Sequence, residues 1–262
     1  MQKKILAITG SKGLLGSNFC KKFKSRFKIL KINYDLNDPK KIINFLKNKD
    51  IDVFLHLAAI GRSISKNRVD FYKINYLATK YLAKYIKTKH FIFSSSSHVY
   101  KPSINIISEK SCTSPRNYYG VSKLLAEKEV IKFQKKYTIL RIFNMYGNNQ
   151  RKGYIIPDLK HKIKIKNYSL LDNVVRDFIH VNDAANAINF VIKNKTYGIF
   201  NICSGKEISL INVVKKIEKK LSTSSNIKFK KTNDKIVGNN KKIIKKGFKF
   251  LKTFNKLNLN SK

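Results

Sequence analysis

The chain lacks tryptophan and holds only three cysteines, four prolines and 15 acidic residues among its 262 residues. Cys20, Cys112 and Cys203 are far apart and odd in number, which argues against a disulfide framework or a cysteine-bound metal. No apolar run approaches the ~20 residues that cross a bilayer. The apolar run at 5–8 is too short for a signal peptide. We therefore expect a cytoplasmic protein with no metal and no membrane span.

What the chain has in excess is positive charge. Its 56 Lys and Arg residues give a formal net charge of +41. A cationic surface attracts polyanions such as nucleic acid. The lysines are nevertheless spread along the chain rather than gathered in one stripe, and we interpret them mainly as solvated surface that reflects a composition bias. A nucleic-acid partner is therefore not the favoured interpretation.

A glycine-rich turn follows the first predicted strand, Lys4–Thr9. Gly10, Gly13 and Gly16 form G-x-x-G-x-x-G before a helix expected over Ser17–Phe27. Glycines there allow a tight turn and close approach of backbone to a pyrophosphate, and the helix N-terminus supplies N–H donors. The context predicts a dinucleotide-binding turn, although an ordinary tight turn between strand and helix is the alternative.

The second predicted strand, Lys28–Ile32, ends at Asn33. Dinucleotide folds often place an acid there to bind the ribose 2′-OH. Asn33 does not repel a 2′-phosphate and Lys12 could approach one, so NADP is a candidate beside NAD. Lys12 is equally well explained as another surface lysine. Asp35 is a candidate for the adenine side of the site.

Further strands are expected at 51–57, 91–95, 138–143 and 198–203, and helices at 70–87, 184–192 and 210–221. Strands that alternate with helices indicate an α/β fold with a Rossmann-like, doubly wound parallel sheet. Ala58 and Ala59, after the third strand, leave room for a cofactor. His56 is expected to pack within that strand. Beyond Ser222 we expect only short apolar clusters.

The most informative stretch, residues 91–127, contains Y-x-x-x-K. Tyr119 and Lys123 are four residues apart, so on a helix they lie on one face. A phenol titrates near ~10, and a neighbouring ammonium would lower its pKa and make Tyr119 a general base near neutrality. A serine at the end of the preceding strand could orient the substrate hydroxyl. The motif also arises by chance in a chain rich in Lys and Tyr.

Seven motifs in order resemble those of the extended short-chain dehydrogenase/reductase family, in its NAD(P)-dependent nucleotide-sugar epimerase/dehydratase branch. They are TGSKGLLG at 9–16, HLAA at 56–59, SSSSHVY at 94–100, YGVSK at 119–123, RIFNMYG at 141–147, RDFIHVND at 176–183 and FNICSG at 200–205. The resemblance covers about residues 3–215.

The resemblance implies a role for each matching residue. The implied catalytic residues are Ser96, Tyr119 and Lys123. The implied cofactor-binding residues are Thr9, Gly10, Lys12, Gly13, Leu14, Leu15, Gly16, Asn33, Asp35, Leu36, Leu57, Ala58, Ala59, Tyr119 and Lys123. The implied substrate-binding residues are Ser96, Ser97, His98, Asn144, Tyr154 and Arg176. Arg176 could contact phosphate, and pairing with Asp177 is the alternative.

The chain also departs from the family pattern. The family's dehydratases carry an Asp-Glu pair where Ser97 and His98 stand, which argues against a dehydratase. In epimerase-reductases a Cys acid stands at the position of His98, and Tyr154 falls near their second acid. His98 is two residues past Ser96, so on an extended chain both would point to one side. An ordinary His pKa near ~6.5 would let His98 move a proton, or both candidates only line the pocket.

The resemblance therefore implies an enzyme that transfers hydride at C4 of a nucleotide-diphosphate sugar, with NAD or NADP and a slight lean to NADP. An epimerase would reuse its cofactor and a plain 4-keto-sugar reductase would consume it. We expect a dinucleotide-binding domain over 1–150, continued by about 174–203, and mainly a substrate-binding lobe over 151–262. A homodimer is possible. The alternative from another class is a non-catalytic dinucleotide-fold protein that binds nucleic acid.

Overall fold

The structure is a computed structural model. It describes residues 2–62, 64–65, 67–148, 150–165, 167–171, 173–230, 232, 234–251 and 254.

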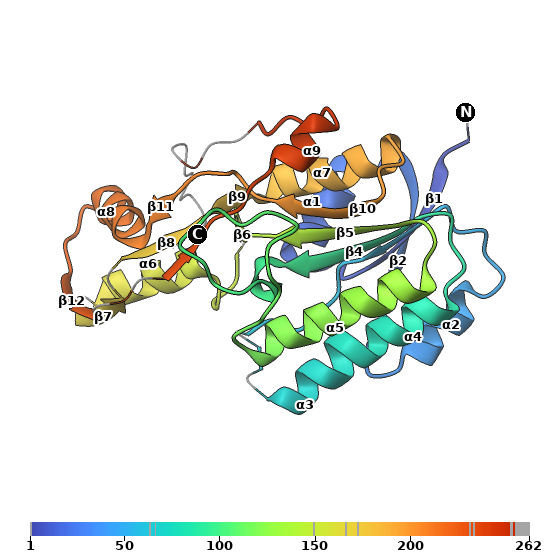
Figure 1. The fold of residues 1–262 in the computed structure, drawn as a ribbon, viewed down its shortest axis with the longest axis horizontal. Coiled ribbons are helices and arrows are strands. Elements are labelled where there is room, and N and C mark those ends of the chain that lie inside the picture. The colour runs from blue at the N-terminus through green and yellow to red at the C-terminus, as the bar shows by residue number, and fades with distance from the viewer. Residues whose placement is uncertain are drawn as a thin grey trace.

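A six-stranded parallel sheet forms the centre of the molecule (Figure 1). Its strands, in spatial order, are β10 (Gly198–Ile202), β5 (Tyr137–Ile142), β4 (Phe91–Ser96), β3 (Val53–His56), β1 (Lys4–Thr9) and β2 (Phe27–Ile32). The chain order runs outward from β1 in both directions, and ligands of doubly wound sheets bind where the order reverses. The predicted fold class is confirmed.

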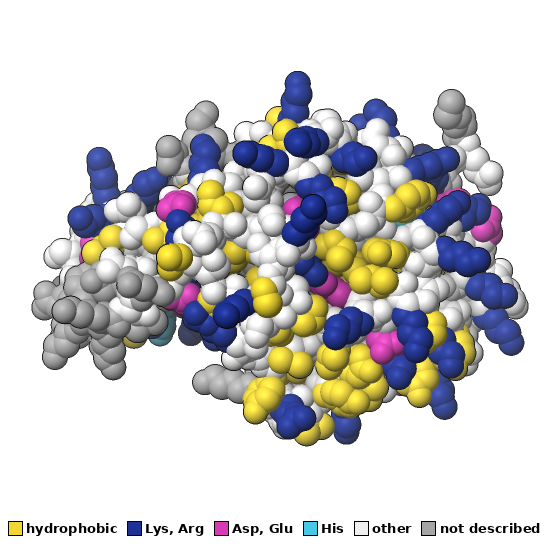
Figure 2. Space-filling model, in the orientation of Figure 1, with side chains coloured by type: hydrophobic (Ala, Val, Ile, Leu, Met, Phe, Trp, Pro, Cys, Tyr) yellow, Lys and Arg dark blue, Asp and Glu magenta, His cyan; other side chains and the backbone are white. Residues whose placement is uncertain are grey.

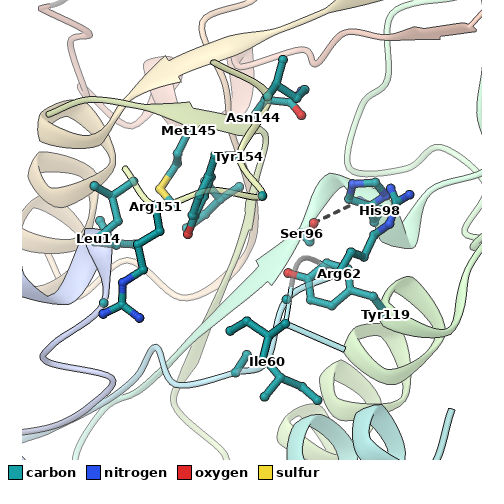
Figure 3. A pocket seen from close by; sticks show the side chains of 18 of the residues that line it. Leu14, Ile60, Arg62, Ser96, His98, Tyr119, Asn144, Met145, Arg151 and Tyr154 are labelled. Atoms are coloured by element: carbon teal, nitrogen blue, oxygen red, sulfur yellow. Dashed lines mark hydrogen bonds between the residues drawn. The ribbon is translucent and has the colours of Figure 1, made fainter. Parts of the chain in front are cut away.

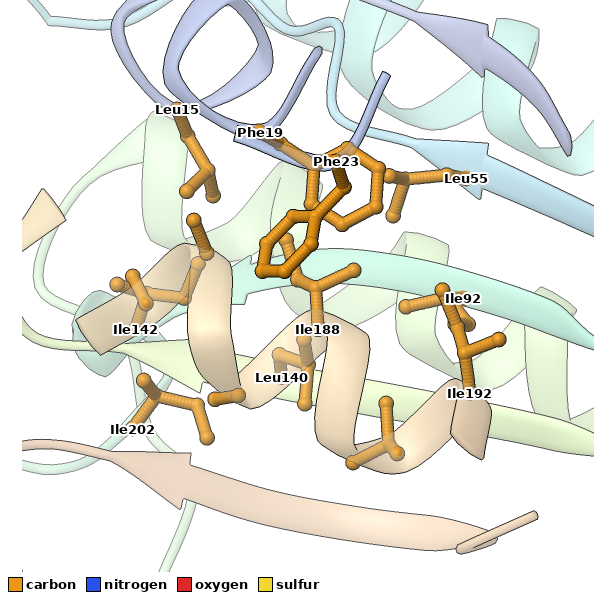
Figure 4. Close-up of a cluster of buried hydrophobic side chains, with 14 of the residues drawn as sticks. Leu15, Phe19, Phe23, Leu55, Ile92, Leu140, Ile142, Ile188, Ile192 and Ile202 are labelled. Atoms are coloured by element: carbon orange, nitrogen blue, oxygen red, sulfur yellow. The ribbon is translucent and has the colours of Figure 1, made fainter. Parts of the chain in front are cut away.

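Helices cover both faces of this sheet because its strands are apolar on both sides. On one face, α1 (Leu14–Phe23) and α7 (Val181–Lys193) pack on the sheet through side chains such as Phe19 and Ile188 (Figure 4). Strand residues alternate between the two faces, so Ile92 belongs to this cluster while its neighbours Phe91 and Phe93 belong to the other. Each strand therefore contributes apolar side chains to the helical layers on both faces of the sheet.

The opposite face is covered by α2 (Pro39–Leu46), α4 (Ala78–Tyr85) and α5 (Tyr118–Phe133). Their buried residues include Ile42, Leu82 and Val130, which pack on Phe54, Phe91 and Phe93 of the sheet. This layer brings α5, the helix that carries Tyr119 and Lys123, against β4, the strand that ends at Ser96.

Two helices differ from the sequence prediction. Helix α1 begins at Leu14 rather than Ser17, since Gly13 ends the turn and Gly16 lies inside the helix. The helix expected over 70–87 is α3 (Arg68–Asp70), a wider π-helical turn η1 (Phe71–Leu77), and α4. A π-turn inside a helix often marks a functional site.

A smaller group of elements lies beyond the carboxyl ends of the large sheet's strands (Figure 1). It contains α6 (Ile155–Ile165), α8 (Leu210–Leu221), β7 (Asn167–Leu171), β8 (Val174–Arg176), β11 (Ile208–Ser209), β12 (Asn226–Lys230) and β13 (Asp234–Ile236). Buried residues such as Leu159 and Ile217 form its own apolar cluster. The predicted boundaries of the two domains stay a prediction.

Three elements complete the chain. The short strands β6 (Asn144–Tyr146) and β9 (Phe178–His180) pair in parallel, and α9 (Lys241–Lys245) packs against β10. The strands and helix after Ser222 were not expected from the sequence, because that segment shows little apolar periodicity. Within the described residues, every helix is too short or too polar to span a lipid bilayer.

Candidate active site

The glycine turn after β1 leaves no room for a side chain at Gly10 or Gly16. A Cβ on Gly16 would lie 2.1 Å from the carbonyl oxygen of Gly10. Gly10 has a positive φ of 72°, and its own Cβ would lie 2.7 Å from the backbone nitrogen of Ala58. Three backbone segments therefore meet at distances that only glycine allows.

The first turn of α1 fits an anionic ligand. Its N-cap is Gly13, no side chain caps the helix, and no acidic residue lies in the first turn. The first N–H groups of a helix have no intrahelical acceptor and carry the positive end of the helix dipole. The residues present therefore fit the pyrophosphate of a dinucleotide.

A buried hydrogen-bond chain lies under this turn. The backbone N–H of Ala58 donates to Thr9 Oγ1 (3.2 Å), which lies 2.7 Å from His56 Nδ1. His56 Nε2 lies 3.0 Å from Thr79 Oγ1, whose hydroxyl donates to the carbonyl of Asn75 (2.7 Å). The Thr79 donation makes Nε2 the protonated nitrogen, so Thr9 donates to Nδ1. Burial lowers the pKa of His56 to about 3. The expected packing of His56 within its strand is thus what the structure shows.

One cavity of about 1210 Å³ runs from the glycine turn to the smaller group of elements. Most of the predicted site residues line it: Gly10, Lys12, Gly13, Leu14, Leu15, Gly16, Leu57, Ala59, Ser96, His98, Tyr119, Lys123, Asn144, Tyr154 and Arg176. In Figure 3, Ser96, His98 and Tyr119 lie on one side of the opening, and Leu14, Arg151 and Tyr154 on the other. Such a volume exceeds the ~300–1,000 Å³ of a pocket for one small molecule.

The other predicted site residues do not line this cavity: Thr9, Asn33, Asp35, Leu36, Ala58 and Ser97. Leu36 belongs to the apolar core and Ser97 is buried. The Asp35 carboxylate accepts from the backbone N–H of Asn37 (2.9 Å), and Asn33 is exposed at the end of β2. The assignment of Ser97 to the substrate and of the other five residues to the cofactor stays a prediction.

Ser96 and Tyr119 come together from β4 and α5. Hydrogen bonding between Ser96 and Tyr119 lowers the pKa of the phenol, as does the charge of Arg62. Burial is the larger effect, and the pKa of Tyr119 is raised overall. Our expectation that Lys123 lowers this pKa is therefore wrong for the protein alone, in which Tyr119 is a phenol at neutral pH.

Lys123 is buried one helical turn beyond Tyr119. Its Nζ lies 4.0 Å from the centre of the Phe93 ring. Burial lowers the pKa of Lys123 to about 7, and the carboxylate of Glu127 opposes that shift. With this pKa, Lys123 is partly a neutral amine near pH 7, and it is not among the groups that shift the pKa of Tyr119. This explains why Lys123 does not lower the pKa of the phenol as expected.

His98 lies in a single 3₁₀ turn, η2 (Ser97–Val99), and not on an extended strand as expected. Ser96 Oγ accepts the backbone N–H of His98 (3.2 Å) and caps this turn. Burial and the charges of Arg62 and Arg176 lower the pKa of His98 to about 4. The ordinary pKa expected for His98 is therefore wrong, because two cations disfavour the imidazolium.

The three remaining substrate candidates, Asn144, Tyr154 and Arg176, line the cavity and differ in their contacts with the rest of the protein. Asn144 donates through Nδ2 to the carbonyl of Asp177 (3.1 Å). Burial raises the pKa of Tyr154, whose charge would in turn raise that of Tyr119. Arg176 pairs with Asp234 (2.6 Å), which corrects the alternative that it pairs with Asp177.

Comparison with known proteins identifies the family of this chain. Residues 6–203 match the model of the NAD dependent epimerase/dehydratase family. The chain belongs to this family. It is 28% identical over 229 residues to GDP-6-deoxy-D-talose 4-dehydrogenase from Aggregatibacter actinomycetemcomitans, and the match covers 79% of this chain and 77% of that protein.

Two solved structures share the fold of this epimerase/dehydratase family member. MoeE5 in complex with UDP-glucuronic acid and NAD has a TM-score of 0.85 at 23% identity, and 95% of each chain is covered. dTDP-4-dehydrorhamnose reductase from Bacillus anthracis in complex with NADP has a TM-score of 0.85 at 19% identity, with 97% of this chain and 96% of that one covered. Structures of this fold thus bind NAD or NADP.

Sequence reasoning missed several residues that line or support this cavity. Arg62 follows β3 and lines the cavity beside His98, and Arg151 lines the opposite wall (Figure 3). Both lie in loops without a pattern. A usable signal was their rarity, since the chain has only seven arginines among 56 basic residues and arginine binds carboxylates and phosphates in a forked geometry that lysine lacks.

Asn75 was the other missed residue. Its Oδ1 accepts the backbone N–H of Ile60 (2.9 Å), and its Nδ2 donates to the carbonyl of Ile60 (3.0 Å) and to Ser122 Oγ (3.3 Å). One side chain therefore pairs with both backbone groups of a cavity-lining residue and ties that loop to α5.

Among the residues that the structure describes, no three His, Cys, Asp or Glu side chains are grouped to hold a metal ion.

Proposed function

We propose that this protein is an NAD(P)-dependent enzyme that transfers hydride at C4 of a nucleotide-diphosphate sugar. The observation that carries the proposal is that Ser96 and Tyr119 line one cavity, which also reaches the glycine turn, and lie close enough for Ser96 to lower the pKa of the Tyr119 phenol. A cavity of about 1210 Å³ has room for a dinucleotide and a nucleotide sugar together. The family membership supports this chemistry, and the similarity to a GDP-6-deoxy-D-talose 4-dehydrogenase supports the same position on the sugar.

The proposed chemistry divides between two hydroxyl groups. Ser96 orients the oxygen on C4, and Tyr119 takes its proton during oxidation or returns one during reduction. Bound NAD(P) supplies the hydride or accepts it. Since the Tyr119 phenol is protonated at neutral pH, it is already in the form that reduction of a 4-keto group requires. Lys123, one turn further along α5, would hold the cofactor ribose.

Whether the net reaction is epimerisation or reduction follows from what the cofactor does. A 4-epimerase would invert C4 reversibly without added cofactor, whereas a plain reductase would consume NADH or NADPH in a single direction. An epimerase-reductase would in addition exchange a proton at C3 or C5, and in deuterated water that carbon would take up deuterium. The cationic charge around His98 disfavours its use as the acid and supports the first two reactions.

The test is substitution of Tyr119 by Phe, with Tyr85→Phe as the control. Tyr85 is 48% exposed and does not line the cavity. With UDP-, GDP- and dTDP-linked sugars as substrates, we expect Tyr119→Phe to lower kcat by about 10²–10⁴-fold while cofactor affinity stays within a few-fold. Activity of Tyr119→Phe within tenfold of wild type would mean that another residue handles the proton.

The rival function, nucleic-acid binding by a non-catalytic dinucleotide fold, rests on the net charge of +41. Figure 2 shows Lys and Arg side chains scattered over the visible face rather than concentrated in one stripe, which favours a solvated surface. Salt-dependent binding of nucleic acid without turnover of any nucleotide sugar would support the rival. The homodimer and the cytoplasmic location stay predictions.

A further inference from the structure

Asn117 has its amide orientation fixed by the helix that it begins. It is the N-cap of α5, with extended backbone, and its Oδ1 accepts the backbone N–H of Gly120 (2.9 Å). Only the oxygen of an amide accepts a hydrogen bond, so the Nδ2 group must point the other way. Nδ2 lies 3.4 Å from His98 Nδ1. The cap therefore presents a donor to the imidazole.

This donor decides which nitrogen of His98 carries the proton. Asn117 Nδ2 is always a donor, so Nδ1 must be the acceptor of the pair. A neutral imidazole has one N–H group, which is then on Nε2. The groups that act on His98 are Arg62 from the loop after β3, Arg176 from β8 and Asp234 from β13. Burial and the two arginines outweigh Asp234, so the ring is neutral near pH 7.

The backbone around His98 is equally constrained. A Cβ on Gly120 would lie 2.3 Å from the carbonyl oxygen of His98, so the first turn of α5 rests directly on this residue. The imidazole meets the Tyr119 ring edge-on at a centroid distance of 5.8 Å. His98 lines the cavity, and among the described residues its Nε2 has no hydrogen-bond partner.

We propose that Asn117 is a positioning residue that holds His98 as a neutral Nε2–H donor, and that this N–H binds an oxygen of the sugar beside the Ser96–Tyr119 pair. The role in sugar binding rests on the proposed function. The tautomer itself does not, because it follows from contacts within the protein. His98 would thus select an oxygen acceptor on the substrate, and would not exchange a carbon-bound proton.

The first experiment reads the tautomer without substrate. In the full chain, labelled with ¹⁵N-histidine and saturated with NAD, long-range ¹H–¹⁵N correlation at pH 7.5 distinguishes protonated from unprotonated ring nitrogens. His98→Gln identifies the His98 signals by their loss. We expect an unprotonated Nδ1 and a protonated Nε2 in the wild type. A protonated Nδ1 would overturn the proposal.

Asn117→Asp is the discriminating variant because Asp also caps helices but offers His98 an acceptor in place of a donor. We expect Nδ1 to become protonated, either as the Nδ1–H tautomer or, at lower pH, as the imidazolium. Asn117→Ser keeps a cap without reaching the ring and should give mixed tautomers. If Asn117→Asp leaves Nδ1 unprotonated, Asn117 does not set the tautomer.

The second experiment reads the donor role through the pH dependence of KM for the nucleotide sugar. In Asn117→Asp the imidazolium keeps Nε2–H at low pH, whereas the Nδ1–H tautomer at high pH leaves Nε2 without a proton. KM should therefore rise about tenfold between pH 6 and pH 9 in excess of any wild-type change. His98→Gln, whose amide still donates, should recover most of the loss seen in His98→Ala.

These readouts separate two kinds of failure. If no nucleotide sugar is turned over but Nε2–H is present in the wild type and lost in Asn117→Asp, the proposed function fails and the positioning role stands. If turnover is found but KM of Asn117→Asp follows the wild-type pH profile, the donor role of His98 fails and the proposed function stands.

Discussion

The two ends of the cavity are built by different means. At the glycine turn, backbone from β1, α1 and the segment after β3 meets within distances that exclude any side chain. At the opposite end, the proposed sugar end, side chains come from separate elements, such as Arg62 from a loop, His98 from η2 and Arg176 from β8. The shape of the first end depends on positions without a side chain. The properties of the second end depend on which polar and charged side chains are present.

This difference indicates how each end tolerates change. A new Cβ at Gly10 or Gly16 has no space, and its neighbours are backbone atoms that cannot move aside. A shortened side chain at the sugar end removes one interaction and leaves the walls in place. The first kind of change should therefore act on cofactor binding and folding together, and the second on substrate alone.

The largest expected effect is that of Gly16→Ala. Its Cβ would lie 2.1 Å from the Gly10 carbonyl oxygen, whereas a Cβ on Gly13 would meet the same atom at 3.3 Å. We expect Gly16→Ala to weaken cofactor binding by about 100-fold, or to destabilise the fold by ~1–3 kcal/mol because α1 must shift. Gly13→Ala is the matched control and should change both quantities much less. Calorimetric titration with NAD and urea unfolding measure the two quantities, and equal effects of the two substitutions would contradict the steric account.

The second effect concerns the buried chain under the glycine turn. His56 has a folded-state pKa of about 3, below its unfolded value of ~6.5. The unfolded state therefore binds more protons, and His56 lowers stability as pH falls below about 6.5. The loss between pH 7 and pH 5 is ~2 kcal/mol. Urea unfolding of wild type and His56→Gln at both pH values isolates the contribution of His56 to this loss. The other titrating groups, such as His90 and Asp177, contribute equally in both proteins. Parallel pH dependences would show that His56 is not neutral in the fold.

The third effect tests the sugar end. Arg62→Gln removes the cation next to His98 and Tyr119, and we expect kcat/KM for the nucleotide sugar to fall about tenfold, the size of one charge-assisted hydrogen bond. Cofactor affinity should not change. Arg26→Gln, at an exposed arginine that does not line the cavity, is the matched control. A parallel loss of cofactor affinity in Arg62→Gln would place Arg62 at the other end of the cavity.

The smallest effect is cofactor choice. Lys12 lines the cavity within the glycine turn and Asn33 carries no charge, so NADP should bind at least as well as NAD. We expect Lys12→Ala to weaken NADP about three- to tenfold and NAD less, as for one exposed ion pair. Lys22→Ala, on α1 and outside the cavity lining, is the control. A strong preference for NAD that Lys12→Ala leaves unchanged would refute this prediction.

The sequence predicts the local features of the fold better than its long-range features. Strand β1 over Lys4–Thr9 and helix α8 over Leu210–Leu221 match their predicted bounds, since each follows from one uninterrupted apolar pattern. Helix α1 begins three residues early because Gly16, normally a sign of a loop, is required inside the helix by the approach of Gly10.

The site was predictable only where one segment carries it. The glycine turn and the Tyr119–Lys123 spacing each lie within a few residues. By contrast, Arg176 is held by Asp234, 58 residues away, and the raised pKa of Tyr119 depends on burial by elements that the motif does not contain. Partners that are distant in sequence leave no trace in composition or periodicity.

The pairing of Asn75 with Ile60 has a consequence for motion. A side chain that hydrogen-bonds both the N–H and the C=O of one residue acts like a one-residue β-bridge. Here it anchors the loop at Ile60. The amide hydrogen of Ile60 should then exchange with solvent only when η1 itself opens, because its acceptor sits on that helix. The loop that carries Arg62 is therefore held in place at Ile60, two residues before Arg62. This attachment limits how far the Arg62 guanidinium can extend into the cavity. Substrates that require Arg62 at a different depth would have to displace a helix rather than a loop.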